Sequence, residues 1–419
     1  LEAAVSLFSK RGIEVLLGAD RAPAKRFDLA VLSPGVDPAR PVVKSVVESG
    51  TPLIGELEAG FLFCRCPLVG LTGTNGKTTT TELIDVAFRS AGKLSRAVGN
   101  IGTPLTEACV DSDRYEVFVV EISSFQLETI RTFRPKVSVM MNITPDHLDR
   151  YPDMETYARA KGRLWDYQRP DDWAVMNVDS ENYLGQLGIR PKSRVLRYAL
   201  RAEPFADYWC EGSKIHRKGE GVILDSHSTK LRGVHNAENL MAALAAAEAW
   251  GLDRGKILPG LCEYRAQPHR LETVRVVNGV EYINDSKATN LDAMEKALTA
   301  FDAPIHLIVG GKDKGFDFKE VLPQVRQKVR TALLVGQMAD KIQKLWDGQV
   351  DCVRAGTVAR AVELASERAR SGEIVLLSPG CSSYDQFHHY EERGQAFRDA
   401  VAALRPKSNS THKESQNGK

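Results

Sequence analysis

The chain has 419 residues, of which 43% are hydrophobic and 26% charged, a balance typical of a globular protein with about two to four domains. Its formal net charge of +2 supplies no general attraction for nucleic acid or for an anionic membrane surface, so neither is expected as a partner. No apolar run approaches the roughly 20 residues that span a bilayer, so no membrane span is expected.

Residues 1–63 are predicted to form a small α/β unit. Apolar, strand-like runs that end in glycine or proline alternate with helical patterns. The helices are expected at 1–12 and 41–50, and the strands at 13–18 and 28–35. Because the chain opens within a helical pattern, we expect this unit to be truncated, with a strand and a glycine-rich turn before Leu1.

Cysteine usage favours a reducing compartment. The seven cysteines form an odd, scattered set, and Cys64 and Cys66 lie in a Cys-Arg-Cys sequence without a second Cys/His pair at zinc spacing. A disulfide framework is therefore not expected, and a cytoplasmic location fits this usage.

Residues 64–266 are predicted to form a second α/β unit. Its strands are expected at 67–73, 115–123, 136–144 and 173–179. They are rich in Val and Ile without alternation, which indicates a parallel sheet covered on both faces. Short strands and turns follow, and a helix at 235–250 closes the unit, with Gly251 at its C-terminal cap.

Residues 267–405 are predicted to form a third α/β unit, and the polar tail at 406–419 is predicted to be disordered. The expected strands of the third unit are 280–285, 305–311, 331–336 and 373–380, each followed by a loop and a helix.

A glycine-rich loop after the strand at 67–73 is predicted to bind polyphosphate. Glycines let backbone N–H groups approach the anion, and the helix that begins at the loop adds its dipole. Lys77 would reach the outer phosphates, and the Thr78 hydroxyl would bind Mg²⁺. The commonest loop of this kind has glycine where Leu71 stands, and the alternative interpretation is a turn that only caps a helix. The residues predicted to contact the nucleotide here are Gly73, Thr74, Asn75, Gly76, Lys77, Thr78 and Thr79.

Two candidate metal ligands follow neighbouring strands. Glu121 ends one apolar strand and His147 comes just after another, and ligands bind at the carboxyl ends of parallel strands. Together they could bind one Mg²⁺ with phosphate oxygens, although either alone is more often a structural residue. Lys161 lies on a helical pattern, and its ammonium group would repel a metal ion.

The third unit opens with polar and basic residues at loop positions. Arg270 offers a planar fork suited to phosphate, and Asp285 could accept a hydrogen bond from a ribose hydroxyl. Lys287, Thr289 and Lys314 suit an acidic substrate. The alternative interpretation of each is an exposed residue of a loop.

The chain resembles the Mur ligases over nearly its whole length after about Ser33. The sequences that carry the resemblance, in the order found in the family, are LTGTNGKTTT, GNIG, EISSFQLE, NITPDHLDRY, ARAKGRL, HNAEN, PHRLE, NDSKATN, GGKDKG and SPGCSSYDQF. Three of them, SSFQLE, DHLDRY and DSKATN, are similar to those of the family member that adds D-glutamate.

The resemblance implies three α/β domains: a Rossmann-like N-terminal domain for UDP, a central P-loop ATPase-like domain with a parallel sheet, and a Rossmann-like C-terminal domain for the amino acid. It also implies the reaction. The carboxylate of UDP-N-acetylmuramoyl-L-alanine attacks the γ-phosphate of ATP, and the amine of D-glutamate then attacks the resulting acyl phosphate. Positioning and cations that offset negative charge would supply most of the catalysis. We further expect a monomer.

The resemblance also implies roles for individual residues. The catalytic set is Lys77, His147, Lys161 and Lys287. The ligands of two Mg²⁺ sites are Thr78, Glu121, His147 and Lys161, with Lys161 carbamylated, which turns a repelled cation into an anionic ligand. The ATP-binding set adds Asn236, Asn239, Arg270 and Asp285. The substrate-binding set is Ser33, Asn100, Ser123, Gln126, Thr289, Lys314, Ser383 and Tyr390.

The sequence departs from the family pattern in a few places. Tyr390 stands where the family has Phe near the side chain of D-glutamate, and Gly380 stands where Ala is usual. The first domain is the weakest match, and only Ser33 and Asp20 are assigned as contacts of UDP.

Three other functions are open at this point. A Mur ligase that adds another amino acid is disfavoured by DSKATN, which stands where the diamino-acid-adding enzyme has a DNPR-type motif. Folylpolyglutamate synthase also has a GTNGK loop, but SSFQLE and DHLDRY disfavour it. A nucleotide-switched binding protein would have no use for an amino-acid pocket in the third unit.

Overall fold

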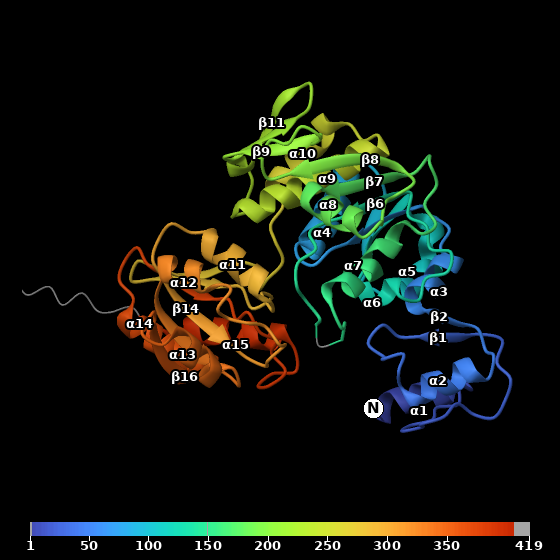
Figure 1. Cartoon of the computed structure of the whole chain (residues 1–419), viewed down its shortest axis with the longest axis horizontal. Coiled ribbons are helices and arrows are strands. Elements are labelled where there is room, and N and C mark those ends of the chain that lie inside the picture. The colour runs from blue at the N-terminus through green and yellow to red at the C-terminus, as the bar shows by residue number, and fades with distance from the viewer. Residues whose placement is uncertain (1, 149, 406–419) are drawn as a thin grey trace, which may run out of the picture.

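The computed structural model describes residues 2–148 and 150–405, so the predicted disorder of the tail at 406–419 lies outside the described residues. The chain folds into three α/β units in chain order (Figure 1). The two-stranded sheet of the first unit is parallel. The sheets of the second and third units are mostly parallel, and each has antiparallel pairing at one edge. The predicted α/β class is therefore confirmed, whereas the exact domain boundaries stay predictions.

The first unit is small. It consists of α1 (Glu2–Lys10), β1 (Ala30–Leu32), α2 (Pro41–Glu48) and β2 (Leu53–Gly55), and β1 and β2 form a parallel pair. The strand predicted at 13–18 is wrong. Leu16 and Leu17 in this run are 52% and 61% exposed, and no neighbouring strand among the described residues pairs with the run.

A short helix, α3 (Glu56–Phe63), joins the first unit to the second. Leu57 of this helix is fully buried in a core cluster of the second unit that also contains Phe118. Glu56 accepts hydrogen bonds from the backbone N–H of Thr106 at 2.8 Å and from its hydroxyl at 2.7 Å. Helix α3 is therefore fixed to the second unit.

The second unit contains a sheet with the strand order β11-β10-β9-β8-β7-β6-β3-β5-β4. Its strands are β3 (Leu68–Thr72), β4 (Ser95–Gly99), β5 (Val117–Glu121), β6 (Val137–Met140), β7 (Trp173–Asn177), β8 (Arg194–Ala199), β9 (Tyr208–Glu211), β10 (Lys214–Arg217) and β11 (Gly221–Asp225). The strands from β4 through β9 pair in parallel, and β9, β10 and β11 pair antiparallel. All the strands predicted in this unit are present.

Helices cover both faces of this sheet. They are α4 (Lys77–Ser90), α5 (Leu105–Ala108), α6 (Ser124–Leu127), α7 (Met154–Gly162), α8 (Val178–Gln186), α9 (Val234–Trp250) and α10 (Arg254–Glu263). On one face α4, α9 and α10 pack on a core that includes Val69 and Leu240, and on the other α3 and α5 pack around Phe118. Helix α9 ends as predicted, with Gly251 at φ 86° in the left-handed region.

The third unit contains a sheet with the order β12-β13-β17-β14-β15-β16, parallel except for β12. Its strands are β12 (Glu272–Val277), β13 (Val280–Asn284), β14 (Ile305–Gly310), β15 (Val329–Val335), β16 (Asp351–Gly356) and β17 (Ile374–Leu377). Its helices are α11 (Leu291–Thr299), α12 (Leu322–Lys328), α13 (Ala339–Trp346), α14 (Val358–Arg368) and α15 (Tyr390–Ala403). The four predicted strands are present, and β12 and β16 are additional.

The carboxyl ends of three central strands meet at one edge of the second unit. Leu71 of β3 lies opposite Glu121 of β5, and Thr72 lies opposite Met140 of β6. The loops that follow these strands therefore lie side by side, which is where ligands bind in parallel sheets. Within 2–148 and 150–405, no helix has the length and apolar character needed to cross a membrane.

Candidate active site

The glycine-rich loop between β3 and α4 is built for close backbone approach. Gly76 has φ 80°, and a Cβ atom there would lie 2.4 Å from Oδ1 of Asn239. A Cβ on Gly73 would lie 2.6 Å from the side chain of Met141. The Lys77 ammonium donates to the carbonyl oxygens of Gly73 at 2.9 Å and Thr74 at 2.7 Å, so it lies folded over its own loop. This is the arrangement of a loop that cradles an anion.

The loop is held by neighbouring residues of the same unit. The backbone N–H of Asn75 donates to Oδ1 of Asn142 at 2.8 Å. The Thr74 hydroxyl lies 3.1 Å from the hydroxyl of Tyr157, which is 1% exposed on α7. Thr78, the predicted hydroxyl ligand of Mg²⁺, is the second residue of α4 and is half-buried.

Glu121 has the environment of a cation ligand. It is 3% exposed at the end of β5, and its Oε1 accepts a hydrogen bond from Asn100 Nδ2 at 2.9 Å. Its buried Oε2 has no hydrogen-bond partner among the described residues. An unpaired buried carboxylate oxygen is costly unless a cation binds it, so the residue fits Mg²⁺.

His147 and Lys161 complete the candidate metal residues. His147 follows β6 in the left-handed region at φ 56°, and burial lowers the pKa of its imidazole, which keeps the ring neutral and able to bind a metal. Among the described residues no three His, Cys, Asp or Glu side chains gather into a metal site. A complete site would therefore need the Thr78 hydroxyl or a chemically altered Lys161.

Lys161 is a buried amine on α7. It is 2% exposed, its Nζ donates to the carbonyl oxygen of Gly73 at 2.8 Å, and it lies 4.6 Å from the ring centroid of Tyr157. Burial first, and then the charge of Lys77, lower its pKa well below the ordinary lysine value. The neutral amine favoured here is the form that can react with carbon dioxide.

A cavity of about 360 Å³ lies where the second and third units face each other. From the second unit it is lined by Lys77, Asn100, Ser123, His147, Tyr157 and Lys161, and from the third by Lys287, Thr289, Lys314, Ser383, Tyr384 and Tyr390. Most of the predicted catalytic and substrate-binding residues therefore share one cavity, and we call it the interdomain cavity.

Lys287 and Tyr390 form one wall of the interdomain cavity. The Nζ of Lys287 lies 3.7 Å from the ring centroid of Tyr390, the first residue of α15. Burial, and next the neighbouring charge of Arg270, lower the pKa of Lys287 to about 8. This lysine can therefore change its charge near neutral pH, as a group that assists an amine must.

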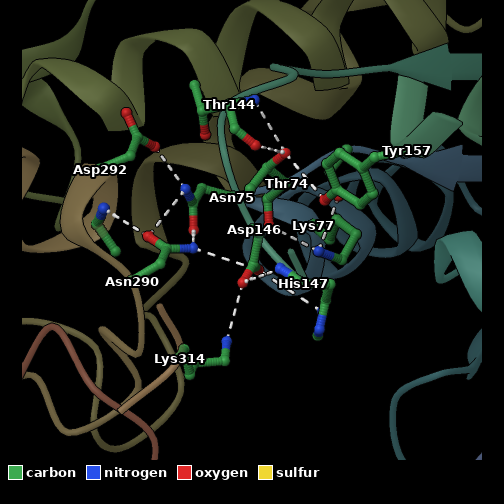
Figure 2. Close-up of polar contacts among 12 residues, drawn as sticks. Thr74, Asn75, Lys77, Thr144, Asp146, His147, Tyr157, Asn290, Asp292 and Lys314 are labelled. Atoms are coloured by element: carbon green, nitrogen blue, oxygen red, sulfur yellow. Dashed lines mark hydrogen bonds and ion pairs between the residues drawn. The ribbon is translucent and has the colours of Figure 1, made fainter. Parts of the chain in front are cut away.

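Asp146 joins the two units beside the interdomain cavity. This residue was not among those predicted from the sequence. Its carboxylate accepts a hydrogen bond from the Lys314 ammonium at 2.8 Å and one from Asn290 Nδ2 at 3.4 Å. Asn290 also contacts the loop residue Asn75, and Asn75 donates to Asp292 of α11. Figure 2 shows Lys314 and Asn290 approaching Asp146 from the third unit, with Asn75 directly above Asn290 in the view.

A second cavity, of about 90 Å³, lies on the other side of Lys287 and also reaches the loop at Gly76. The predicted ATP-binding residues that line it are Asn75, Gly76, Thr79, Asn236, Asn239, Arg270 and Asp285. Asn239 Nδ2 donates to Oδ1 of Asn236 at 2.8 Å, and burial raises the pKa of Asp285 to about 7. His235 and Lys296 also line this cavity, and the sequence reasoning did not select them.

Of the predicted substrate residues, Ser33 and Gln126 lie outside the lining of the interdomain cavity. Ser123 and Gln126 form a capping box at the start of α6, where the Gln126 side chain accepts from the Ser123 N–H at 2.9 Å. Ser33 and Gln126 line a narrow cavity between the first and second units. Asp20 is exposed and lines none of these three cavities.

Comparisons with known proteins match two family domains to the second and third units. The Mur ligase middle domain matches residues 71–247, and the Mur ligase, glutamate ligase domain matches residues 269–381. A protein of Pelotomaculum thermopropionicum named UDP-N-acetylmuramoylalanine--D-glutamate ligase is 44% identical over 403 residues, covering 94% of this chain and 88% of the relative. One of the same name from Myxococcus xanthus is 41% identical over 387 residues, covering 90% and 84%.

Solved structures share the fold at low identity. A MurF ligase from Thermotoga maritima in complex with ADP has a TM-score of 0.63 at 14% identity, covering 91% of this chain and 96% of that one. A folylpolyglutamate synthase from Mycobacterium tuberculosis complexed with ADP and AMPPCP has a TM-score of 0.61 at 16% identity, covering 84% and 96%. Both likenesses concern the fold.

Proposed function

The chain belongs to the Mur ligase family, and from this premise we propose that it joins D-glutamate to UDP-N-acetylmuramoyl-L-alanine, with conversion of ATP to ADP and phosphate. The relatives that carry the name of this activity are 44% and 41% identical over most of the chain. The interdomain cavity supports the proposal most directly, because Lys77 of the phosphate loop and Lys287 line it from opposite units.

The two cavities suggest how ATP lies in the site. We place the nucleoside in the cavity lined by Asn236, Asn239 and Arg270, and the phosphates along the loop at Gly76 and Lys77. The terminal phosphate then points toward the interdomain cavity. There it meets the carboxylate of UDP-N-acetylmuramoyl-L-alanine, which Asn100 and Ser123 border.

The chemistry follows from the weakness of a carboxylate as an electrophile. Attack of the substrate carboxylate on the γ-phosphate gives an acyl phosphate, from which phosphate leaves when the D-glutamate amine attacks. Lys77 offsets charge on the transferred phosphoryl group. Lys287, Thr289 and Lys314 bind the carboxylates of D-glutamate, and Lys287 with a pKa of about 8 can hold or release a proton beside the attacking amine.

We propose that Mg²⁺ binds at two places in this site. Thr78 would hold one ion with phosphate, and Glu121 and His147 would hold the other with Lys161 as a carbamate. Bound Mg²⁺ would neutralise phosphate charge and polarise the phosphoryl oxygens. The unpaired Oε2 of Glu121 and the lowered pKa of Lys161 support this assignment.

The remaining assignments are proposals of the same kind. Residues 1–63 would bind the UDP portion of the substrate, 64–266 ATP, and 267–405 D-glutamate, with Ser33 and Gln126 near the first boundary. The enzyme would act as a monomer in the cytoplasm, where ATP and nucleotide-linked sugars are available.

An amino-acid panel with ADP release as the readout tests the function. With UDP-N-acetylmuramoyl-L-alanine as the acceptor, D-glutamate is expected to support ADP release, whereas L-glutamate, L-alanine and diamino acids are not. Release with L-glutamate and a folate would instead assign folylpolyglutamate synthase activity. ADP release without any amino acid would favour a nucleotide switch and contradict the ligase assignment.

A further inference from the structure

Cys64 and Cys66 form a thiol pair that the ligase chemistry does not use. Their Sγ atoms lie 3.7 Å apart, and the Cys64 Sγ also lies 3.4 Å from the carbonyl oxygen of Cys66. All seven cysteines of the chain are within the described residues and are free thiols, and this pair is the only one among them in thiol–thiol contact.

The pair is held in place by two rigid elements. Cys64 caps the C-terminus of α3, and Cys66 is followed by Pro67 and the buried strand β3. Glu58 of α3 is 1% exposed and accepts hydrogen bonds from the backbone N–H groups of Arg131 at 2.9 Å and Phe133 at 3.0 Å. The two elements therefore hold the thiols within contact distance of each other.

The helix is anchored near Cys64 as well. Gly60 packs so closely on Leu105 that a Cβ atom would lie 2.8 Å from its backbone carbon. The backbone N–H of Arg65, between the two cysteines, donates to the Ser112 hydroxyl at 3.0 Å. The turn that carries the pair is therefore fixed by α3 before Cys64, by the hydrogen bond of Arg65, and by β3 after Cys66.

The two thiols differ in the way that thiol–disulfide exchange requires. Cys64 is half-buried and so can be reached from solvent, whereas Cys66 is 8% exposed and packs in the core. Hydrogen bonding to Cys66 lowers the pKa of Cys64 to about 7, and the same contact raises the pKa of Cys66. An accessible thiolate beside a buried second thiol is the pattern of a reactive cysteine with its resolving partner.

We propose that Cys64 and Cys66 are a redox-active dithiol, a modification site that low-molecular-weight disulfides convert into an intramolecular disulfide. The Cys64 thiolate attacks one sulfur of oxidised glutathione, forms a mixed disulfide and releases one glutathione thiolate. Cys66 then loses its proton to solvent and attacks the Cys64 sulfur, which releases the second glutathione. Two protein thiols are oxidised and one glutathione disulfide is reduced, so electrons and atoms balance.

The disulfide between Cys64 and Cys66 is expected to be readily reduced. Disulfide formation shortens the sulfur–sulfur distance from 3.7 Å to about 2.05 Å, which the side chain of Cys64 can accomplish at the solvent side. A bond that closes so short a loop gains little from chain entropy, so dithiol reductants should open it. The proposal does not depend on the ligase function.

Tryptic mapping of the full-length protein tests the proposal, because trypsin cleaves after Arg65 and separates the two cysteines. The protein is equilibrated with oxidised glutathione, alkylated and digested without reduction. We expect peptides 45–65 and 66–77 to be recovered joined by a disulfide, with the mass of the pair lower by two hydrogens, and to separate after dithiothreitol.

Two variants make the test specific. Cys66→Ser should leave Cys64 as a stable mixed disulfide with glutathione, and Cys109→Ser, a nearby thiol that donates to the Thr106 carbonyl at 3.1 Å, should leave the 64–66 bond unaffected. Recovery of both peptides with free, alkylated thiols at full oxidant exposure would overturn the proposal. A disulfide between either cysteine and Cys109 would overturn it as well.

Discussion

Lys161 shows how the environment of one residue changes its chemistry. Its amine is 2% exposed and lies beside the charge of Lys77, so the cationic form of lysine is disfavoured there. A neutral amine can react with carbon dioxide, and the proposed carbamate would carry the negative charge that a bound Mg²⁺ favours. The same burial that makes the residue a poor cation makes it a suitable precursor of an anionic ligand.

Replacing Lys161 with alanine is expected to lower kcat by about 100-fold or more, because an absent ligand misplaces the reacting groups. Labelled bicarbonate supplies a readout other than activity: the wild-type protein should show a ¹³C carbamate resonance that the variant lacks. Lys192→Ala, at an exposed lysine, should keep both the resonance and the turnover. A Lys161→Ala enzyme with normal turnover would contradict the carbamate.

Asp146 is expected to act as a positioning residue for D-glutamate. Its pair with Lys314 is largely buried, with the two side chains 10% and 13% exposed. Asp146→Asn keeps the shape but removes the charge that orients the lysine, so KM for D-glutamate should rise roughly tenfold. KM for ATP should change much less. Asp171→Asn, at a side chain 76% exposed, should change neither constant, and an unchanged KM for D-glutamate in Asp146→Asn would contradict the role.

The lowered pKa of Lys287 leads us to expect that amino-acid binding depends on pH. With a pKa of about 8, its side chain is a cation below pH 8 and loses its charge as the pH rises through that value. KM for D-glutamate should therefore increase above pH 8, because the carboxylate loses a partner. In Lys287→Arg the charge persists, so the increase in this range should disappear. Identical pH profiles of KM for the two enzymes would contradict the assignment.

The candidate site could be predicted from the sequence where a residue follows a strand or lies in a short motif. Glu121 and His147 were predicted because the carboxyl ends of parallel strands gather ligands, and the loop at Gly76 was predicted from its glycines before Lys77 and Thr78. The contacts of Asp146 with Asn290 and Lys314 between the units were not predicted. They depend on how the two units pack against each other, and the local sequence does not indicate that packing. The roles of the predicted residues stay predictions.

At the scale of elements, the connection from β3 through the loop to α4 places the phosphate-binding groups. Strand β3 lies between β5 and β6 and is buried throughout, so the loop that follows it has a fixed origin. The left-handed Gly76 then turns the chain into α4, whose N-terminus faces the site. Side chains larger than hydrogen would meet the Asn239 side chain at this turn.

Gly76→Ala is therefore expected to weaken ATP binding by about tenfold or more, since strain of roughly 1–2 kcal/mol adds to the steric clash with Asn239. Titration calorimetry measures the effect. Gly251→Ala is a matched control, because that glycine also has a positive φ of 86° but has open space around its Cβ position. It should lose about 1–2 kcal/mol of stability, because alanine is strained at this φ, and keep its ATP affinity. Equal affinities of both variants would contradict the proposed role of the loop.

The elements themselves differed in how well the sequence predicted them. Buried parallel strands such as β17 are continuous apolar runs, and α9 has a long apolar pattern with a glycine cap, so these were predicted correctly. The run at 13–18 also has a high apolar content, but no strand within 2–148 and 150–405 pairs with it. Strand β16 was missed because Asp351 and Arg354 interrupt its apolar pattern at the sheet edge.

At the scale of the molecule, the proposed catalytic groups are divided between two units. The second unit contributes Lys77 and the proposed metal ligands His147 and Lys161, and the third contributes Lys287 and Lys314. The contacts of Asp146 and Asn75 across the boundary bring these halves together (Figure 2). Phosphoryl transfer and amide formation can then use one cavity, so the activated carboxylate need not leave the site.

Transfer of oxygen from substrate to phosphate tests this central claim. If the carboxylate of UDP-N-acetylmuramoyl-L-alanine attacks ATP, one of its oxygens leaves with the phosphate when the D-glutamate amine displaces it. With ¹⁸O at both oxygens of that carboxylate, mass spectrometry should therefore find one ¹⁸O in each phosphate released during product formation. Unlabelled phosphate, or label acquired from H₂¹⁸O instead, would mean that ATP is hydrolysed by water and would contradict carboxylate activation in the interdomain cavity.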